Sequence, residues 1–162
     1  MKKQAFTYIA FLVSYFLFIS LYRNWLDLGY WPFWLGGLIG IILPELDHVV
    51  YVFFSNPREV TSQRVQFLCK NGQYKRCVRL MLSTGRERMG LIFHTIFFQA
   101  IFFVLTFWVM TSSISLFGKG IVLAFSLHLV VDQIVGFFDK GEPSKTTLVV
   151  VILLVLIFGF LL

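Results

Sequence analysis

Long uninterrupted hydrophobic runs dominate this chain. A membrane-spanning helix needs roughly 20 apolar residues, and five stretches approach or reach that length: 5–22, 30–54, 90–112, 120–138 and 146–162. Apolar residues follow one another continuously in these stretches, whereas the strands of a membrane barrel alternate apolar and polar residues. The pattern therefore predicts an all-α integral membrane protein, in which residues 1–162 form a single domain with a bundle of about five transmembrane helices.

Composition agrees with a membrane protein. Hydrophobic residues make up 58% of the 162 positions and charged residues 14%, whereas a soluble domain carries about 25% charged residues. Lys2 and Lys3 precede the first run, which is long for a signal peptide and is not followed by a small-residue cleavage pattern. We therefore expect the first run to be a retained signal anchor.

Basic residues between the second and third runs predict the orientation of the chain. The connection 55–89 contains eight Lys and Arg residues, and its only acids are Glu59 and Glu87. Loops rich in Lys and Arg stay on the cytoplasmic side of a membrane. We therefore expect the loop 55–89 and the N-terminus to be cytoplasmic and the C-terminus to lie outside.

Part of this loop has the spacing of an amphipathic helix. Its apolar positions recur at i, i+3, i+4, i+7 and i+8: Tyr74, Cys77, Val78, Met81 and Leu82. Lys75, Arg76 and Arg79 fall on other faces of such a helix. This pattern suits the inner leaflet, where cations meet anionic headgroups. The alternative is a short helix packed on the spans.

Two cysteines, Cys69 and Cys77, fall in the same loop. Their spacing is not that of a zinc knuckle, and the reducing cytosol disfavours disulfides. We therefore expect two free thiols.

Six ionisable side chains lie in or beside the apolar runs: Glu45, Asp47, His48, His94, His128 and Asp132. The expected orientation places all six in the middle or the inner half of the membrane. Ionisable groups at that depth are energetically costly and usually face a partner or a cavity, so they mark function. His128 and Asp132 share a helical face at i and i+4. Glu45 and His48 share one at i and i+3 if the helix continues through Pro44.

These residue types favour a metal site inside the helix bundle. Imidazole and carboxylate ligands together suit zinc, manganese or iron better than calcium or magnesium. The expected ligands of a divalent transition metal, zinc above all, are Asp47, His48, His94, His128 and Asp132. Glu45 lies near them and is the candidate general base. The alternative for each group is an interhelical hydrogen bond, the role that we expect for Thr95, Gln99, Ser126 and Gln133.

Arg86 and Arg88 lie at the expected membrane edge below His94. Guanidinium groups bind phosphate with two parallel hydrogen bonds. Both arginines are therefore candidates for holding a substrate phosphate, and the alternative is a solvated loop end.

The motifs around these residues resemble the YdjM-like family of bacterial inner-membrane proteins, which are predicted membrane-bound metal-dependent hydrolases. The segment from Pro44 to His48 is similar to the family's Pro-Asp-x-Asp-His motif, with Glu45 in place of the first Asp. The segment from His128 to Asp132 is similar to its His-x-x-x-Asp motif. His94 matches the second His of a His-Arg-Gly-x-Thr-His-Ser segment, in which Met89, Gly90 and Phe93 replace the first His, the Arg and the Thr. The resemblance covers roughly residues 36–138.

The resemblance implies a multi-pass protein of the bacterial inner (plasma) membrane with hydrolase activity. Together with the ionisable residues, it predicts a membrane-embedded metal-dependent hydrolase that acts at the cytoplasmic leaflet on a lipid-linked phosphoester. The expected partner is membrane lipid, anionic or as a lipid-linked substrate, and no nucleic acid is expected. One alternative is a transporter of metal ions or protons. Another is a non-enzymatic membrane scaffold with a degenerate metal site.

Overall fold

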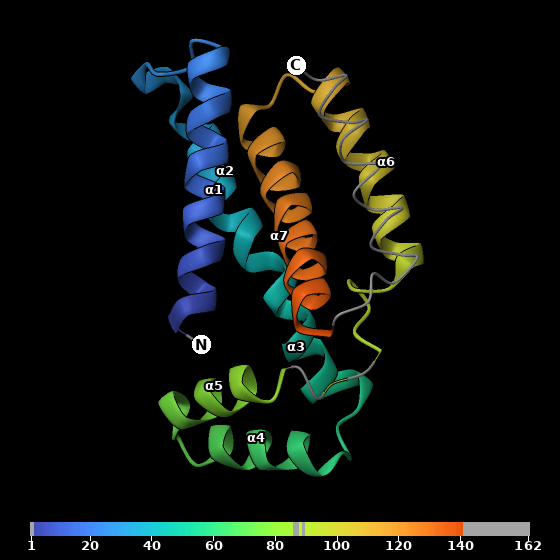
Figure 1. Ribbon diagram of the computed structural model, residues 1–162. Coiled ribbons are helices and arrows are strands. Elements are labelled where there is room, and N and C mark those ends of the chain that lie inside the picture. Colours follow the sequence, from blue (N-terminus) through green and yellow to red (C-terminus); the bar gives the residue numbers. More distant parts are fainter. Residues whose placement is uncertain (1, 86–87, 89, 141–162) are drawn as a thin grey trace. The chain divides into compact units, whose positions relative to one another are not determined.

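A computed structural model gives the helices of this chain (Figure 1). It describes the backbone of residues 2–85, 88 and 90–140, and the side chains of the same residues except 2–8 and 134–140. Over these residues the regular structure is helical and contains no strand, so the all-α prediction is confirmed there.

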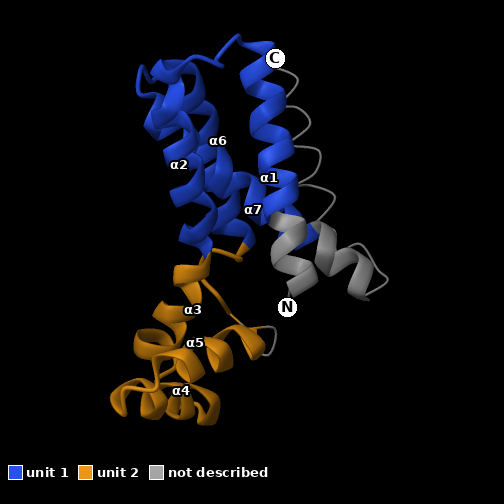
Figure 2. Ribbon diagram, turned by 90° about the vertical axis from the view of Figure 1, so that its left-hand side faces the viewer, with its two compact units in different colours: residues 1–44, 96–162 blue, residues 45–95 orange. Residues whose placement is uncertain are grey.

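The chain divides into two compact units, residues 1–44 with 96–162 and residues 45–95 (Figure 2). The boundary falls within the second expected span, just after Pro44. The second unit therefore combines the end of that span with the basic loop. Each unit is described by itself.

Over its described residues, the first unit is built of helices (Figure 1). They are α1 (Lys2–Tyr22), α2 (Trp31–Ile42), α6 (Ile96–Ser112) and α7 (Leu116–Lys140), and a short 3-10 turn, η1 (Leu28–Tyr30), precedes α2. Helix α7 packs along α2 on one side and against α6 on another, and α1 contacts both α2 and α7. In its core the side chains of Phe16, Phe33 and Leu123 are almost completely enclosed.

Glycines let α2 and α7 approach backbone to backbone. A Cβ atom at Gly36 would collide with the carbonyl oxygen of Phe117, and one at Gly40 would collide with that of Ile121. From the other helix, a Cβ at Gly120 would collide with the backbone of α2. Small residues at such positions are a common means of packing helices in membranes. The close packing that the glycines of the second run favour is therefore present.

Two helical segments among the described residues are long and apolar enough to cross a membrane: Leu28–Ser55, with 28 residues, and Leu116–Gln133, with 18. They correspond to the second and fourth expected spans. Ile9–Tyr22 and Ile96–Ser112 are shorter apolar helices, and the fifth expected span, 146–162, lies outside the described residues. A helical protein with two helices that could span a membrane is thus supported, and five spans stay a prediction.

The second unit begins where Pro44 interrupts the long apolar helix. Proline lacks the backbone donor that an α-helix needs, and a 3-10 turn, η2 (Leu43–Glu45), occupies this position. A short helix α3 (Leu46–Val50) follows and continues as a π-helical turn, η3 (Tyr51–Ser55). The basic loop then forms two helices, α4 (Val60–Lys70) and α5 (Tyr74–Ser83). The expected helix over 74–82 is therefore confirmed as α5.

A small core joins α4 and α5. Its buried members are Val52, Val65 and Cys77. Cys69 and Cys77, whose Cα atoms are 5.5 Å apart, form a disulfide. The expectation of two free thiols is therefore wrong in this structure. That expectation was based on the reducing cytosol. The turn between α4 and α5 brings the two Cα atoms within the range that a disulfide bridges.

Candidate functional site

Asp47 is the most enclosed of the predicted site residues, with 1% of its surface exposed. Its carboxylate accepts hydrogen bonds from the backbone N–H groups of Ile92 at 3.1 Å and Phe93 at 2.6 Å. The second oxygen, Oδ2, also lies 3.4 Å from Nδ1 of His94. Buried carboxylates need such donors, because leaving a charge unpaired in the interior is costly. Asp47 therefore fixes the turn that carries His94.

His94 takes its orientation from this carboxylate. A carboxylate accepts hydrogen bonds and does not donate them, so the contact places a proton on Nδ1 of His94. The lone pair of a neutral ring then lies on Nε2. In metal sites, a carboxylate that holds one ring nitrogen in this way orients the other nitrogen toward the ion. The contacts give Asp47 the geometry of a positioning residue, although the sequence predicts a direct ligand.

His48 lies beside this pair in the second unit. Its ring centroid is 6.4 Å from that of His94, and its Nε2 is 3.8 Å from a carboxylate oxygen of Glu45. The expected shared face of Glu45 and His48 is therefore present, even though Pro44 interrupts the α-helix before them. Gly85 packs against the His48 ring, because a Cβ there would lie 3.2 Å from its Cε1 atom. The side chain of Glu45 is 43% exposed on the surface of the protein.

His128 and Asp132 form a second pair, within the first unit. Nδ1 of His128 lies 2.8 Å from the carbonyl oxygen of Ile41 on α2, and Nε2 lies 3.3 Å from Oδ2 of Asp132. A carbonyl only accepts, so Nδ1 must carry a hydrogen. The lone pair of a neutral ring then points at a carboxylate, which is also an acceptor. A proton or a cation between Nε2 and Oδ2 would resolve this conflict.

The His128–Asp132 separation suits a metal ion. Zinc bonds its nitrogen and oxygen ligands at about 2.1 Å in a tetrahedron, which places two ligand atoms about 3.4 Å apart. The observed 3.3 Å is close to this value, and it is also short enough for a direct ion pair, like the 3.4 Å contact between His94 and Asp47. A metal-binding histidine commonly donates its other N–H to a backbone carbonyl, as His128 does to Ile41. The pair therefore fits two neighbouring metal ligands.

The six predicted groups thus belong to two sets, each described within its own unit. Glu45, Asp47, His48 and His94 gather in the second unit, and His128 and Asp132 lie in the first. Among the described residues, no group of three or more His, Cys, Asp or Glu side chains is arranged to hold a metal ion. A single centre that all six share stays a prediction.

Arg88 has a buried position, with 5% of its surface exposed. Its Nη2 donates to Oγ1 of Thr84 at 3.0 Å, and its guanidinium carbon lies 5.9 Å from the centre of the Tyr51 ring. Cation–π contacts occur at such distances. These contacts hold the segment after α5 against η3. The phosphate-binding role of Arg88 stays a prediction, and Arg86 lies outside the described residues.

The polar residues expected to make hydrogen bonds behave in different ways. Ser126 shares a hydrogen bond of 2.9 Å with Thr106, which joins α7 to α6 and confirms the expectation. Thr95 donates to the carbonyl of Ile92 at 2.7 Å, within its own turn. Gln99 is completely buried, and within the described part of the chain neither atom of its amide has a hydrogen-bond partner.

Sequence reasoning missed the backbone groups that position the histidines. The carbonyl of Ile41 and the N–H groups of Ile92 and Phe93 come from apolar residues, whose side chains give no signal of this role. Glycine offers a partial signal, because Gly40 precedes Ile41 and brings the backbone of α2 close to α7.

The comparisons with known proteins give no match: none among protein-family models, none among curated proteins and none among solved structures. The likeness to the YdjM-like motifs therefore rests on the motif residues alone and stays a resemblance. The function of the chain has to be inferred from the contacts of its own side chains.

Proposed function

We propose that this chain is a membrane-embedded metal-dependent hydrolase that acts at the cytoplasmic leaflet of the bacterial inner membrane. The observation that carries the proposal is the contact of His128 with two acceptors, the Ile41 carbonyl at 2.8 Å and Asp132 at 3.3 Å. A divalent cation between His128 and Asp132 would satisfy both side chains, and their donor types suit zinc, manganese or iron.

In this proposal, His128 and Asp132 are the metal ligands for which the structure gives contacts. His128 and Asp132 bind the ion, and the Ile41 carbonyl holds His128 in the tautomer that leaves Nε2 for the metal. His48 and His94, which belong to the second unit, stay metal ligands predicted from the sequence. A divalent metal ion held by these residues would act as a Lewis acid and would activate water for attack on the substrate.

Two carboxylates in the second unit have different proposed roles. Asp47 positions His94, because its oxygens already accept two backbone N–H groups. Glu45 is the better general base, since it is partly exposed and lies beside His48. A lipid-linked phosphoester is the proposed substrate, on the grounds of the expected membrane depth and of the predicted phosphate-binding role of Arg86 and Arg88.

Elemental analysis of the purified full chain tests the metal. We expect a stoichiometric transition metal in the wild type and its loss in Asp132→Asn, which keeps the size of the side chain and removes its charge. Asp27→Asn, an exposed position in the turn before η1, is the matched control and should retain the metal. Circular dichroism of all three proteins shows whether they are equally folded. A wild type that binds no transition metal would end the proposal.

Hydrolysis needs a separate measurement. Phosphate release from phosphatidic acid in mixed micelles serves as the probe, with protein that is loaded with zinc or stripped by a chelator. We expect release only from the loaded protein, and its loss in Glu45→Gln without loss of the metal. Release that is independent of the metal would contradict the mechanism.

One alternative is favoured by the same His128–Asp132 contact. Nε2 of His128 and Oδ2 of Asp132 lie 3.3 Å apart, and intramembrane His and Asp pairs serve as proton relays in transporters. Proton or zinc flux in proteoliposomes, abolished by Asp132→Asn, together with absence of phosphate release, would replace the hydrolase by a transporter.

A further inference from the structure

The apolar face of α5 is wider than the surface that covers it. Cys77 is 3% exposed and packs into the core shared with α4, with Met81 beside it. Tyr74, Val78 and Leu82 are instead 69%, 49% and 43% exposed. They are spaced at i, i+4 and i+8, so they form a continuous apolar stripe along the helix. We call these three residues the α5 stripe.

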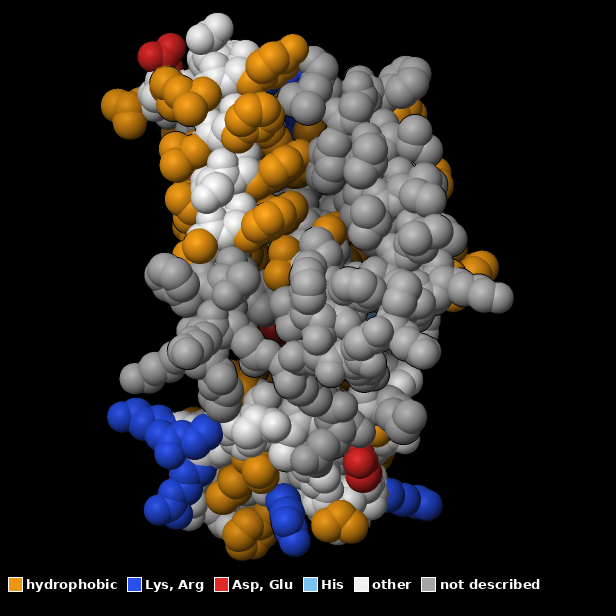
Figure 3. Space-filling view, in the orientation of Figure 1, with side chains coloured by type: hydrophobic (Ala, Val, Ile, Leu, Met, Phe, Trp, Pro, Cys, Tyr) orange, Lys and Arg blue, Asp and Glu red, His pale blue; other side chains and the backbone are white. Residues whose placement is uncertain are grey.

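Cations line one edge of the α5 stripe. Lys75 follows Tyr74 and Arg79 follows Val78, so each lies about 100° around the helix from its stripe neighbour. Both are exposed and, at i and i+4, they share one face. Over α4 and α5, Lys and Arg side chains project beside apolar side chains (Figure 3). An apolar stripe with cations along its edge is the arrangement of helices that lie in a membrane interface.

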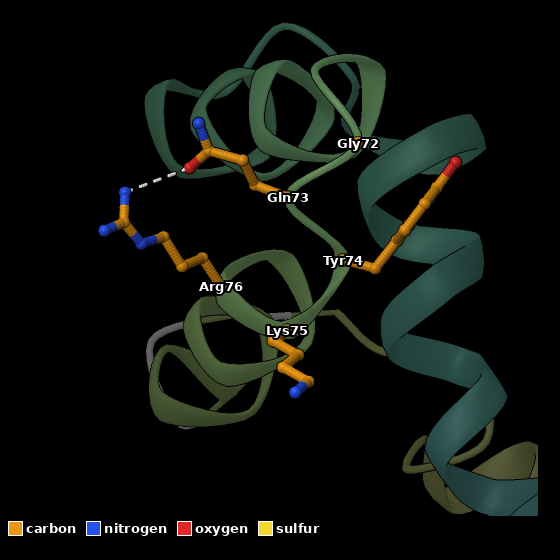
Figure 4. Close-up of a pocket in the computed structure, with 5 residues that line it drawn as sticks. All are labelled: Gly72, Gln73, Tyr74, Lys75 and Arg76. Atoms are coloured by element: carbon orange, nitrogen blue, oxygen red, sulfur yellow. Dashed lines mark hydrogen bonds between the residues drawn. The ribbon is translucent and has the colours of Figure 1, made fainter.

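The turn before α5 adds a shallow, open depression with basic side chains beside it. Gly72, with a φ of +71°, allows the tight turn, and the depression is lined by Gly72, Gln73, Tyr74, Lys75 and Arg76. Nη1 of Arg76 donates to Oε1 of Gln73 at 3.1 Å, and Lys75 points away from that hydrogen bond (Figure 4). The first backbone N–H groups of a helix also favour an anion. The positive charge thus gathers at the end of the stripe that carries Tyr74.

The positive charge around the α5 stripe favours a negatively charged covering surface. Residues 60–85 contain five cations, Arg64, Lys70, Lys75, Arg76 and Arg79, and no Asp or Glu. A second copy of the hairpin would bring like charges together. A surface that is apolar and negatively charged at once complements the stripe and its edge, and an anionic lipid leaflet has both properties.

We propose that the α5 stripe docks on an anionic membrane leaflet. Tyr74, Val78 and Leu82 enter the boundary between headgroups and acyl chains, while Lys75 and Arg79 contact lipid phosphates. The aromatic ring of Tyr74 suits the interface because it is apolar with a polar tip. The inference depends on unit 45–95 alone, and the proposed metal chemistry is not needed for it.

Hydrogen–deuterium exchange of the full chain in nanodiscs tests the docking. We expect the amides of 74–83 to exchange several-fold more slowly in nanodiscs that contain phosphatidylglycerol than in phosphatidylcholine alone. Lys75→Gln with Arg79→Gln should remove the difference. Arg58→Gln with Arg64→Gln removes the same charge elsewhere in the unit and should preserve it. Equal exchange in the two lipids, or equal effects of the two double variants, would overturn the proposal.

Photo-crosslinking identifies the covering surface directly. A benzoylphenylalanine at Val78 should form lipid adducts, detected as a mass increase of the intact protein, whereas one at Gln63, an exposed polar position on α4, should form far fewer. Crosslinks from position 78 to another segment of the chain, or to a second copy, would show that protein covers the stripe and would refute docking on lipid.

Discussion

The two units differ in the backbone groups that orient their histidines. In the first unit a backbone carbonyl, that of Ile41, accepts from His128, and the carboxylate of Asp132 faces the other ring nitrogen. In the second unit backbone N–H groups donate to the carboxylate of Asp47, and this carboxylate faces His94. The comparison shows that equal residue pairs take different roles, because the backbone groups around them differ. Asp132 contacts a ring nitrogen of a histidine on its own helix, whereas Asp47 accepts two backbone N–H groups beside His94.

The two units also differ in the contacts that hold the helices and turns around each pair. The first unit is held by close helix packing at glycines, and the position of His128 follows from the distance between α2 and α7. The second unit is held by polar and covalent links, which include Asp47, the Arg88–Thr84 hydrogen bond and the disulfide. Substitutions that remove one kind of link should therefore affect one unit and spare the other.

Asp47→Ala should have the largest effect. It leaves the N–H groups of Ile92 and Phe93 buried without an acceptor, and each such loss costs about 1–3 kcal/mol. We expect the second unit to lose about 4 kcal/mol of unfolding free energy, measured by hydrogen exchange of residues 91–95. Asp47→Asn, which keeps an acceptor oxygen, should restore part of it. Unchanged exchange in Asp47→Ala would contradict the positioning role of this carboxylate.

Gly36→Ala should destabilise the first unit by about 3 kcal/mol, the upper end of what overpacking costs. The new Cβ meets the carbonyl of Phe117, which belongs to a helix backbone and cannot turn away as a side chain could. Thermal unfolding in detergent measures the change. Gly29→Ala is the control, because nothing lies within 4 Å of a Cβ there. Equal shifts in the two variants would mean that α2 and α7 are not in backbone contact.

Removal of the disulfide should have the smallest effect of the three. Cys69 and Cys77 are 8 residues apart, and closing so short a loop stabilises a fold by about 2.5 kcal/mol in the chain-entropy model. We expect Cys69→Ser with Cys77→Ser to increase exchange in α4 and α5, and to leave α2 and α7 unchanged. Peptide mapping without reductant checks the link first. Alkylation of both thiols in intact cells would show that the link does not form there.

The sequence predicts the helices better than the contacts between them. Apolar runs and the spacing of Tyr74 to Leu82 depend on local periodicity, and α1, α5 and α7 appear close to where they are expected. Helix α2 covers only the first part of the expected span 30–54, and α6 begins at Ile96, so His94 lies in the turn before this helix. The prediction of free thiols failed because it depended on the expected cytoplasmic location of the loop. That location follows from the Lys and Arg residues and carries no information about the 5.5 Å between the Cα atoms of Cys69 and Cys77. The sequence could not distinguish the role of Asp47 from that of Asp132. The contacts that distinguish them involve the backbone of Ile41, Ile92 and Phe93, residues that are distant along the chain from the side chains they orient.

The glycine contact between α2 and α7 has a consequence for the proton on His128. The Nδ1–Ile41 distance is 2.8 Å, and a Cβ added at Gly40 would collide with the carbonyl oxygen of Ile121, so the helices would have to move apart. The hydrogen bond would then lengthen, and the Ile41 carbonyl would hold the hydrogen on Nδ1 less strongly. The spacing of two helices thereby selects a tautomer, and a change in that spacing would exchange the donor and acceptor ends of the imidazole that faces Asp132.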